Sequence, residues 1–378
     1  MRTIELTHKS RCAGSLLWLA VFCLAAILPA VATGEDEPTY ITIEGQVYGA
    51  QADEVGPIGG GVGYTRIVTE GDHVVTNLDE LLEALDEAKR GQVIFIPGHV
   101  EIDCTARIHI EGLILEIPEG VTLASNRGHD GSAGALLYSD TLDTNPLIRV
   151  MGPDVRITGL RIRGPNPKRY IDHHRRSFTE RLPDGTTRGH EYYYKFPISR
   201  GIETEHPNLE VDNCEISAFS HTGIFLIRGD DHHIHHNFIH HCQYQGLGYG
   251  VCHDVSTSLI ERNLFDWNRH SIAGTGRAGS GYVARHNVEL GTSLSHCFDM
   301  HGQREAGTTI AGTTIHIHNN TFRAQATPMF IRGAPEDVCE VHSNWFPRHA
   351  NPGEAVRHGE NTVVRDNAYG DDPPRVIP

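Results

Sequence analysis

The sequence predicts an all-β protein built as a parallel β-helix, a solenoid in which short strands stack coil upon coil. Two repeats in the second half of the chain lead to this prediction. One is a short strand that usually ends in glycine, at Gly223–Gly229, Gln245–Val251, His270–Gly276, His296–Gly302, Thr327–Gly333 and Gly353–Gly359. The other is an asparagine after a β-branched run, at positions 237, 263, 287, 320, 344 and 367. Both recur about every 25 residues, which indicates one supersecondary unit repeated in a stack.

Each unit of this length holds two or three short strands and leaves no room for a helix. This excludes helical solenoids and α/β folds with helical crossovers, and it favours strands stacked on themselves. One asparagine at the same turn of every coil is expected to form a ladder of side-chain hydrogen bonds along the stack. We therefore interpret these asparagines as scaffold and not as site residues.

Residues 1–32 have the pattern of a secretory signal peptide, so the mature protein is expected to be secreted or periplasmic. Three basic residues precede the apolar run Leu16–Leu28, and Ala30–Ala32 supplies the small residues of a cleavage site. The alternative is an uncleaved membrane anchor. However, the apolar run is shorter than the ~20 residues that a spanning helix needs. No membrane contact is expected of the mature form.

Residues 33–64 are rich in glycine and acidic side chains and are expected to form an irregular N-terminal arm. A helix is predicted over residues 77–90, because Asn77 and Glu80 form a capping box and leucines recur at helical spacing up to Gly91. Such a helix can cover the open end of a sheet. Residues 65–378 are expected to form one β-helix domain without another helix, with first strands at Val93–Pro97, Ile108–Ile117, Val121–Leu123, Leu147–Val150 and Val155–Ile162.

One segment, residues 165–197, interrupts the repeat and is predicted to be a long loop insertion. It carries many arginine, histidine and tyrosine side chains and little apolar content. Long loops in compact folds are often functional, so this loop is a candidate wall of a substrate groove. The alternatives are a flexible tip and a loop that only covers the neighbouring coil.

Composition restricts the partners. The formal net charge is −16, and it becomes −18 without residues 1–32, which carry three positive charges and one negative charge. Nucleic acid is therefore not an expected partner, since binding it requires a basic surface. An anionic substrate is possible only where cations are concentrated locally. Six cysteines remain in the mature chain, and neither their pairing nor the oligomeric state follows from the sequence.

The stretch Ser295–Gly302 concentrates the candidate chemistry, because His296, Asp299 and His301 lie within six residues of one another. Successive side chains of a strand point to opposite faces. Asp299 and His301 are therefore expected to face solvent together, while the apolar residues beside Asp299 point into the coil.

Stacked strands also predict columns of side chains, about 4.8 Å apart from coil to coil. The inward column is expected to contain Phe225, Leu247, Ile272, Phe298 and Met329. The outward column is expected to contain Arg228, Thr275, His301, Arg332 and His358, with His270 and His296 in a second column at the strand entry. This arrangement would gather cations and imidazoles on one face of an acidic protein.

Such a face suits proton abstraction next to a carboxylate, which needs a cation, a base and an acid. Arg332, with Arg228 in support, is the candidate cation, because guanidinium binds carboxylate in a bidentate way. His301, oriented by Asp299, is the candidate base. The candidate acids are His296 and His270, with Tyr249 as a further donor. The candidate substrate-binding residues are Arg228, His221, Arg269, His358 and Tyr193.

Structural alternatives exist for these assignments. Asp299 and His301 could form a surface hydrogen-bonded pair, and Arg332 could cover an apolar neighbour with its stem. Tyr249 could be a core residue. The histidine-rich run Asp230–Cys242 invites a metal site, but His233 and His235 flank an inward-pointing isoleucine, so surface histidines are favoured. No motif requires a cofactor, although calcium or zinc would be compatible with the residues present.

Several motifs together resemble the pectate-lyase-like right-handed parallel β-helix superfamily, over most of residues 55–370. They are the capping helix, Gly59–Tyr64, Val93–Gly98 and the coil repeat. The acidic calcium ligands and the R-x-P-x-x-R motif of calcium-dependent pectate lyases are missing, as are the paired aspartates of polygalacturonases. The stretch His296–His301 resembles the Y-G-F-D-P-H motif of mannuronan C5-epimerases, with Arg332 as the arginine of the following coil. His296 replaces the tyrosine of that motif, and Met300 replaces the proline.

The resulting expectation is a secreted polysaccharide lyase that cleaves an acidic, uronate-containing polysaccharide by β-elimination. A uronate C5-epimerase is the first alternative, since it needs nearly the same residues. A glycoside hydrolase needs two carboxylates about 5 to 9.5 Å apart, and the outward columns offer only Asp299 and, two coils on, Glu354. A non-catalytic carbohydrate-binding or metal-binding protein on the same scaffold is the third alternative.

Overall fold

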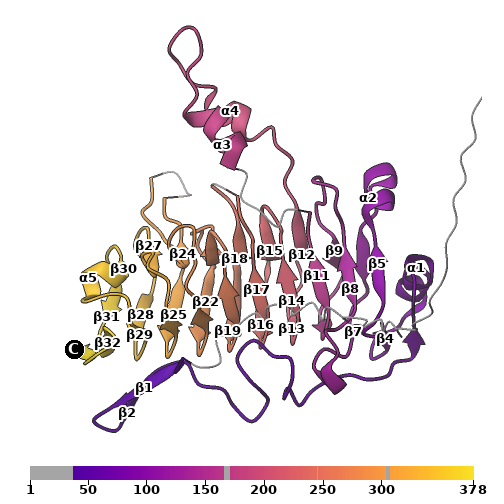
Figure 1. Cartoon of the computed structure of the whole chain (residues 1–378), viewed down its shortest axis with the longest axis horizontal. Coiled ribbons are helices and arrows are strands. Elements are labelled where there is room, and N and C mark those ends of the chain that lie inside the picture. Colours follow the sequence, from indigo (N-terminus) through magenta and orange to yellow (C-terminus); the bar gives the residue numbers. More distant parts are fainter. Residues whose placement is uncertain (1–36, 166–170, 245, 304–306) are drawn as a thin grey trace, which may run out of the picture. The chain divides into compact units, whose positions relative to one another are not determined.

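Three stacked parallel sheets form the body of the chain in the computed structural model, which describes residues 37–165, 171–244, 246–303 and 307–378 (Figure 1). The chain divides into two compact units, Met1–Pro38 and Thr39–Pro378. The three sheets belong to the second unit. The predicted signal peptide, residues 1–32, lies outside the described residues. Among the described residues, no helix has the length and apolar character to cross a membrane.

Each coil contributes one strand to each sheet, and strand order in every sheet follows the order of the coils. This is the predicted parallel β-helix.

Sheet 1 contains β3 (His73–Val74), β4 (Val93–Phe95), β7 (Thr122–Ala124), β10 (Arg156–Thr158), β13 (Glu210–Asp212), β16 (Gly229–His235), β19 (Ser256–Glu261), β22 (Gly281–Arg285), β25 (Thr314–His318), β28 (Val338–His342) and β31 (Thr362–Val364). Sheet 2 contains β5 (Glu101–Asp103), β8 (Leu136–Tyr138), β11 (Arg161–Arg163), β14 (Glu215–Ser217), β17 (Phe238–His240), β20 (Leu264–Asp266), β23 (Val288–Glu289), β26 (Thr321–Phe322), β29 (Trp345–Phe346), β32 (Asn367–Tyr369) and the antiparallel β33 (Arg375–Ile377). Sheet 3 contains β6 (Leu115–Ile117), β9 (Ile148–Val150), β12 (Arg200–Thr204), β15 (Thr222–Leu226), β18 (Tyr249–His253), β21 (His270–Gly274), β24 (Phe298–Met300), β27 (Met329–Ile331) and β30 (Val356–Arg357).

The core fills the inside of the coils with apolar columns. In sheet 3 the inward column consists of Ile224, Val251, Ile272, Phe298, Met329 and Val356. Burying each such side chain contributes about 1.5–3 kcal/mol. The predictions of Phe225 and Leu247 for this column are wrong. Phe225 lies one position further along β15 and faces outward with Cys252 and Ala273, and Leu247 lies before β18 begins.

The asparagine ladder is confirmed. From Asn237 to Asn367, each side-chain amide donates to the side-chain oxygen of the asparagine on the next coil, over 2.9–3.0 Å. The same oxygen accepts the backbone N–H of the preceding asparagine. All six asparagines are fully buried. The ladder therefore holds one corner of successive coils in register.

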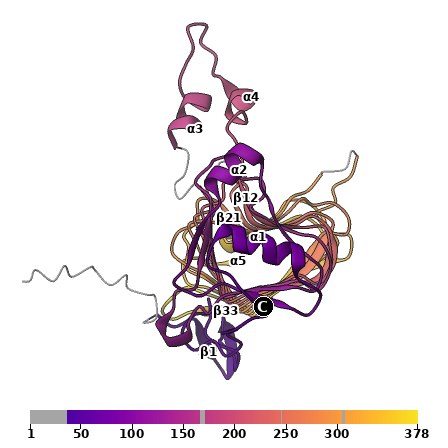
Figure 2. The same ribbon diagram turned by 90° about the vertical axis from the view of Figure 1, so that its right-hand side faces the viewer.

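The capping helix α1 (Leu78–Glu87) lies across one end of the stack (Figure 2). Asn77 caps it, accepting the Glu80 N–H at 3.0 Å, and Leu81 and Leu85 are buried. The helix ends three residues before the predicted boundary of 90. The N-terminal arm is not wholly irregular, because β1 (Tyr40–Ile43) and β2 (Gln46–Gly49) form a hairpin.

Further helices occur that the sequence did not predict: α2 (Thr105–Glu111), α3 (Ile171–Phe178), α4 (Gly189–Tyr193), α5 (Pro352–Ala355) and a short 3-10 helix (His129–Gly131). The predicted strand Ile108–Ile117 is half helix, because Gly112 ends α2 in a left-handed conformation and β6 starts after it. The predicted loop 165–197 contains α3 and α4, which project from the coils as a helical hairpin (Figures 1 and 2). Residues 166–170 lie outside the described part.

Candidate active site

Asp299 is the centre of a polar cluster on the outer face of sheet 3. The residues on either side of it in β24 are fully buried in the core, so its side chain points outward, as strand alternation predicts. The carboxylate is nevertheless covered, with 0% side-chain exposure. Its Oδ1 accepts from Arg332 Nε at 2.8 Å and lies 2.9 Å from His296 Nε2. Its Oδ2 lies 3.2 Å from His301 Nε2.

Two imidazoles stack beside this carboxylate. The rings of His270 and His296 lie 3.9 Å apart between centroids, at an interplanar angle of 27°. His270 Nδ1 donates to the carbonyl oxygen of His296 over 2.6 Å, so in the neutral ring the lone pair is on Nε2. Tyr249 stacks on the other side of His270, at 5.7 Å. Rings from three successive coils therefore form one column at the entry of the strands.

Arg332 joins the carboxylate to the imidazoles. Its Nη2 lies 3.0 Å from His296 Nε2 and 3.4 Å from His270 Nε2. Ligand atoms of His270, His296 and Asp299 lie within 4.8 Å of one another, which is a spacing suited to a metal ion. The Arg332 guanidinium contacts all three of these groups, so the positive charge at this point comes from the chain itself. A metal ion here would have to displace it.

Burial and these contacts together set the protonation states of Asp299, His296 and His270. Burial opposes ionisation of Asp299, but the hydrogen bond from His296 and the neighbouring imidazole and guanidinium groups outweigh it and lower the pKa of Asp299 to about 2. Burial lowers the pKa of His296 below its ordinary value and that of His270 well below it. Near neutral pH the cluster therefore holds an ionised Asp299 and two neutral imidazoles.

Only part of the cluster can touch a ligand. The exposed fractions of the side chains are 12% for His296, 18% for His301 and 26% for Arg332, whereas Asp299 and His270 are buried. His301, His296 and Arg332 thus form the surface, and Asp299 and His270 support it from below. Tyr249 is also buried, and its hydroxyl donates to the carbonyl of Gly246 at 3.0 Å.

A hollow of about 210 Å³ opens beside His296, lined by Ser295, His296, Ala326, Thr327, Phe330 and Arg357. Arg357 lies on the coil after Phe330, as its ladder partner. It forms no ion pair with any of the described residues. Sequence reasoning missed Arg357, because the glycine-bounded pattern suggested His358 instead.

Two predicted members of the outward column, Arg228 and His358, lie elsewhere. His301 and Arg332 donate their backbone N–H to the carbonyls of Gly274 and Met300, each one residue before the equivalent position of the previous coil. Ile227 and Thr275 donate in the same way, to Thr204 and His253, so Ile227 holds the position predicted for Arg228. Arg228 lies 3.9 Å from Glu205 in an ion pair, and His358 is exposed, one residue after Arg357. A one-residue shift moves a side chain to the other face of a strand, which explains both errors.

His221 and Arg269 lie next to the column of rings. The His221 ring meets Tyr249 edge to face at 5.9 Å, and burial lowers its pKa to about 3. Arg269 donates to the carbonyl of Leu247 at 3.3 Å, and burial lowers its pKa. A hollow of about 590 Å³ starts here, lined by Asp143, Tyr194, Lys195, Phe196, Pro197, Ile198, His221, Gly246, Leu247 and Tyr249.

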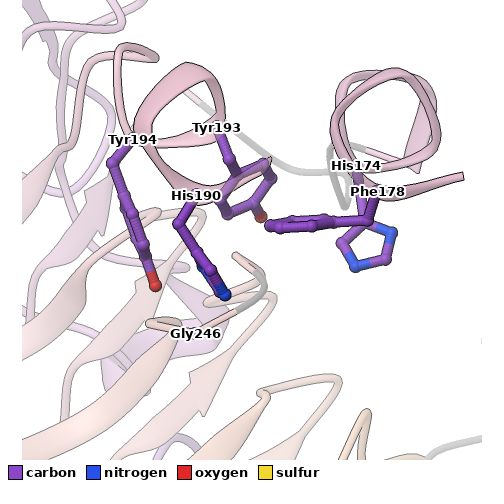
Figure 3. Close-up of a pocket in the computed structure, with 6 residues that line it drawn as sticks. All are labelled: His174, Phe178, His190, Tyr193, Tyr194 and Gly246. Atoms are coloured by element: carbon purple, nitrogen blue, oxygen red, sulfur yellow. The ribbon is translucent and has the colours of Figure 1, made fainter. Parts of the chain in front are cut away.

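Tyr193 fastens the α3–α4 hairpin to the coils. It is 1% exposed and stacks on Tyr244 with centroids 4.8 Å apart. The adjacent Tyr194 is 48% exposed and lines the large hollow. The exposed tyrosine of the pair is therefore Tyr194, one residue after Tyr193 (Figure 3).

The histidine-rich run forms β16 of sheet 1 and β17 of sheet 2, away from this cluster. His235, predicted to face solvent, is buried, as is His236. The reason is the N-terminal arm, whose Asp53 lies 3.1 Å from His236 Nε2 and whose Tyr64 hydroxyl donates to Asp212 at 2.7 Å. Glu210, His233 and His235 have atoms close enough for a metal ion, but Arg66 and Arg156 already neutralise Glu210. These contacts fit a structural role.

Comparison with known proteins bears on the fold. Residues 200–369 match the family model described as a right handed beta helix region. Similar solved structures include an alginate lyase from Paenibacillus sp. strain FPU-7, with 14% identity, 79% of this chain and 97% of that chain covered, and a TM-score of 0.45. The Dettilon tailspike protein matches with 12% identity, coverages of 77% and 55%, and a TM-score of 0.42. The A-module of a mannuronan C-5 epimerase from Azotobacter vinelandii matches with 13% identity, coverages of 84% and 90%, and a TM-score of 0.36.

No curated protein matches the sequence significantly. The family match and the order of the strands confirm the predicted right-handed parallel β-helix.

Proposed function

We propose that the protein is a polysaccharide lyase that acts on a uronate-containing polysaccharide by β-elimination. One observation carries the proposal: a buried, ionised Asp299 holds two imidazoles and a guanidinium together, and all three of those groups reach the surface at one point. Elimination needs a cation for the uronate carboxylate, a base for the C5 proton and a proton for the leaving oxygen.

Arg332 is the cation of this reaction. Asp299 fixes its Nε, and no contact of its Nη1 is found in the part of the chain that the structure describes. Nη1 can therefore bind the substrate carboxylate and stabilise the negative charge that develops when carbon 5 loses its proton. Arg357, in the hollow beside His296, supplies a further cation for the same polyanionic chain.

His301 is the base. Its Nε2 lies 3.2 Å from Asp299 Oδ2. In the tautomer that carries the proton on Nε2, the lone pair of the neutral ring is on Nδ1, which takes the C5 proton. The electrons of the C5–H bond then form the double bond between carbons 4 and 5, and the bond from carbon 4 to the glycosidic oxygen breaks. That oxygen receives its proton from the His301 imidazolium, which returns His301 to its neutral form.

The test uses mature protein and a panel of polymannuronate, polyguluronate, polygalacturonate and polyglucuronate. Elimination creates an unsaturated uronate whose ultraviolet absorbance is followed with time. We expect absorbance to grow with at least one polymer, to disappear in His301→Ala and to persist in His316→Ala, a control on sheet 1. New reducing ends without ultraviolet absorbance would refute the proposal and indicate hydrolysis.

A uronate C5-epimerase is the second candidate. His296 and His301 approach different oxygens of Asp299, so two imidazoles lie on two sides of one carboxylate. In heavy water, an epimerase would bring deuterium to carbon 5 without cleavage, whereas a lyase shortens the chain. A hydrolase is not favoured, because Asp299 with a pKa of about 2 carries no proton to donate and Glu354 instead caps α5 through Asn351 and Ala350.

A further inference from the structure

An aromatic hollow lies between the α3–α4 hairpin and the coil that contains Gly246 (Figure 3). Its volume is about 220 Å³, and its lining residues are His174, Phe178, His190, Tyr193, Tyr194 and Gly246. The rings of His190 and Tyr194 are nearly parallel, with 6.0 Å between centroids and an angle of 13°. Rings presented in this way offer flat apolar faces, on which the faces of sugar rings can pack.

The hairpin is fixed well enough to hold a ligand. Tyr193 stacks on Tyr244, and the Tyr244 hydroxyl donates to the carbonyl of Tyr193 at 3.0 Å. Gly246 has a positive φ of 89°, and a Cβ added there would lie 2.3 Å from the Tyr194 hydroxyl. A glycine is thus needed at 246 for Tyr194 to keep its position. The exposed ring is set against the solenoid by close packing.

This hollow continues toward the reacting centre. Tyr194 and Gly246 also line the hollow of about 590 Å³ that reaches His221 and Tyr249. Tyr249 stacks on His270, which lies behind His296. A chain of sugars bound at Arg332 could therefore extend along these residues to the hairpin.

The connecting hollow carries cations that the rest of the protein does not neutralise. Lys195 lines it, and Arg269 lies behind its wall. Neither residue forms an ion pair within the described residues. Asp143 is the one acidic residue in the lining. Lys195 and Arg269 together leave the hollow positively charged, which suits a polyanionic chain.

We infer that the α3–α4 hairpin is a distal sugar-binding arm, in which Tyr194 stacks on a sugar several residues away from the reacting one and Lys195 binds a carboxylate between them. The inference rests on the proposed function for the identity of the ligand. It assigns the inserted hairpin to the recognition of chain length. Long chains reach both Arg332 and Tyr194, whereas short oligosaccharides reach only the reacting centre.

The experiment measures binding and catalysis separately. Dissociation constants for the polymer that gives the strongest elimination signal, or for polygalacturonate if none does, are measured by calorimetry with a His301→Ala background. Tyr194→Ala and Lys195→Gln are compared with Arg181→Gln, which removes a charge from the same hairpin outside both hollows. We expect Tyr194→Ala to weaken long-chain binding about tenfold, equivalent to ~1.4 kcal/mol, and to leave the binding of disaccharides unchanged. Arg181→Gln is expected to change neither affinity.

A second variant guards against a local folding defect. Gly246→Ala should displace Tyr194 without removing its ring, and it should weaken long-chain binding in the same way. Unchanged long-chain affinity in both Tyr194→Ala and Gly246→Ala would overturn the inference even if elimination is observed. Loss of long-chain binding without any elimination activity would support the arm while refuting the lyase. Conversion of a dimer to a monomer by Tyr194→Ala in sedimentation would also overturn it, because the hollow would then be an interface between two copies.

Discussion

Two clusters of histidine, carboxylate and arginine lie on different sheets of the solenoid, and they differ in what covers them. On sheet 3, Asp299 is buried, but His301 and Arg332 remain 18% and 26% exposed. On sheet 1, Glu210 binds His235 at 3.1 Å and Arg66 at 2.7 Å. There the N-terminal arm covers His235 and His236, which are only 2% exposed, while His233 and Arg66 remain 36% and 42% exposed.

The electrostatics of the two clusters are alike. In each, burial opposes ionisation of the carboxylate, while hydrogen bonds from histidine and the charge of arginine prevail, and the pKa falls to about 2 for both Glu210 and Asp299. A strongly lowered pKa therefore does not identify the functional cluster in this protein. The hollows distinguish the sheet 3 cluster, because one hollow lies beside His296 and another beside Tyr249.

The largest expected difference between the clusters concerns their carboxylates. Asp299→Asn removes the charge that orients His301 and Arg332, and it is expected to lower the elimination rate about 100-fold or more. Glu210→Gln is expected to leave the rate close to that of the wild type and to lower the free energy of unfolding by about 2 kcal/mol, since it weakens charged hydrogen bonds. Initial rates and denaturant titrations measure the two effects. Equal loss of activity in both variants would mean that the clusters are not functionally distinct.

A smaller effect is expected at the edge of the site on sheet 3. Arg357→Gln should raise KM about tenfold with little change in kcat, because one charge-assisted contact with a neighbouring carboxylate is lost. Arg375→Gln, which removes an equal charge on sheet 2, is the control. A fall in kcat at unchanged KM would instead place Arg357 in the chemical step.

Sequence reasoning succeeded where a feature repeats and failed where it occurs once. The stacked asparagines and the alternation around Asp299 recur on many coils, so their structural consequence could be read directly. Arg357 could not be found in this way. The pattern Gly353–Gly359 suggested a full strand, but Pro352–Ala355 form helix α5, and the strand that follows has only two residues. The register of the residues that follow therefore differs by one position from the predicted register, and each side chain lies on the opposite face of the strand.

The coverage of a cluster by distant segments was also beyond the sequence. His235 sits in a strand whose alternation predicts an exposed side chain, and it does point out of the coil. It is buried because Asp53 and Tyr64 belong to an arm that returns across sheet 1, far away in the sequence. Local periodicity holds no information about such a contact.

Acid is expected to loosen the arm on sheet 1. Burial lowers the pKa of His236 and lowers that of His286 to about 4, and His286 Nδ1 accepts the N–H of Gln51 in the arm at 3.3 Å. Because the folded pKa lies below the unfolded one, the unfolded chain binds more protons, and stability is lost as pH falls from about 6.5 toward 4. Hydrogen exchange of residues 50–66 should accelerate over this range, while strands β8 and β11 of sheet 2, which contain no histidine, serve as the internal reference. Equal acceleration in both would indicate global unfolding instead.

The last comparison concerns Glu289, a buried acid beside which no cation is found among the described residues. It points into the core of the same coil as Asp299, between Phe265 and Phe322 of the neighbouring coils. Burial raises its pKa to about 8, and the Ser271 hydroxyl offsets this only in part. Asp299 and Glu289 thus show that neighbouring cations, and not burial, decide whether a carboxyl group in this solenoid is charged.

Glu289→Gln tests this difference through stability. The folded pKa lies above the unfolded one, so the folded wild type binds more protons, and its free energy of unfolding falls as pH rises from about 4.5 to 8. The variant has no carboxyl group to ionise at this position. The difference in free energy of unfolding between the variant and the wild type should therefore increase in favour of the variant over the same range, by at most about 1.4 kcal/mol per pH unit. Urea titrations at several pH values measure the difference. A difference that does not change with pH would mean that Glu289 ionises in the folded protein as easily as in the unfolded chain.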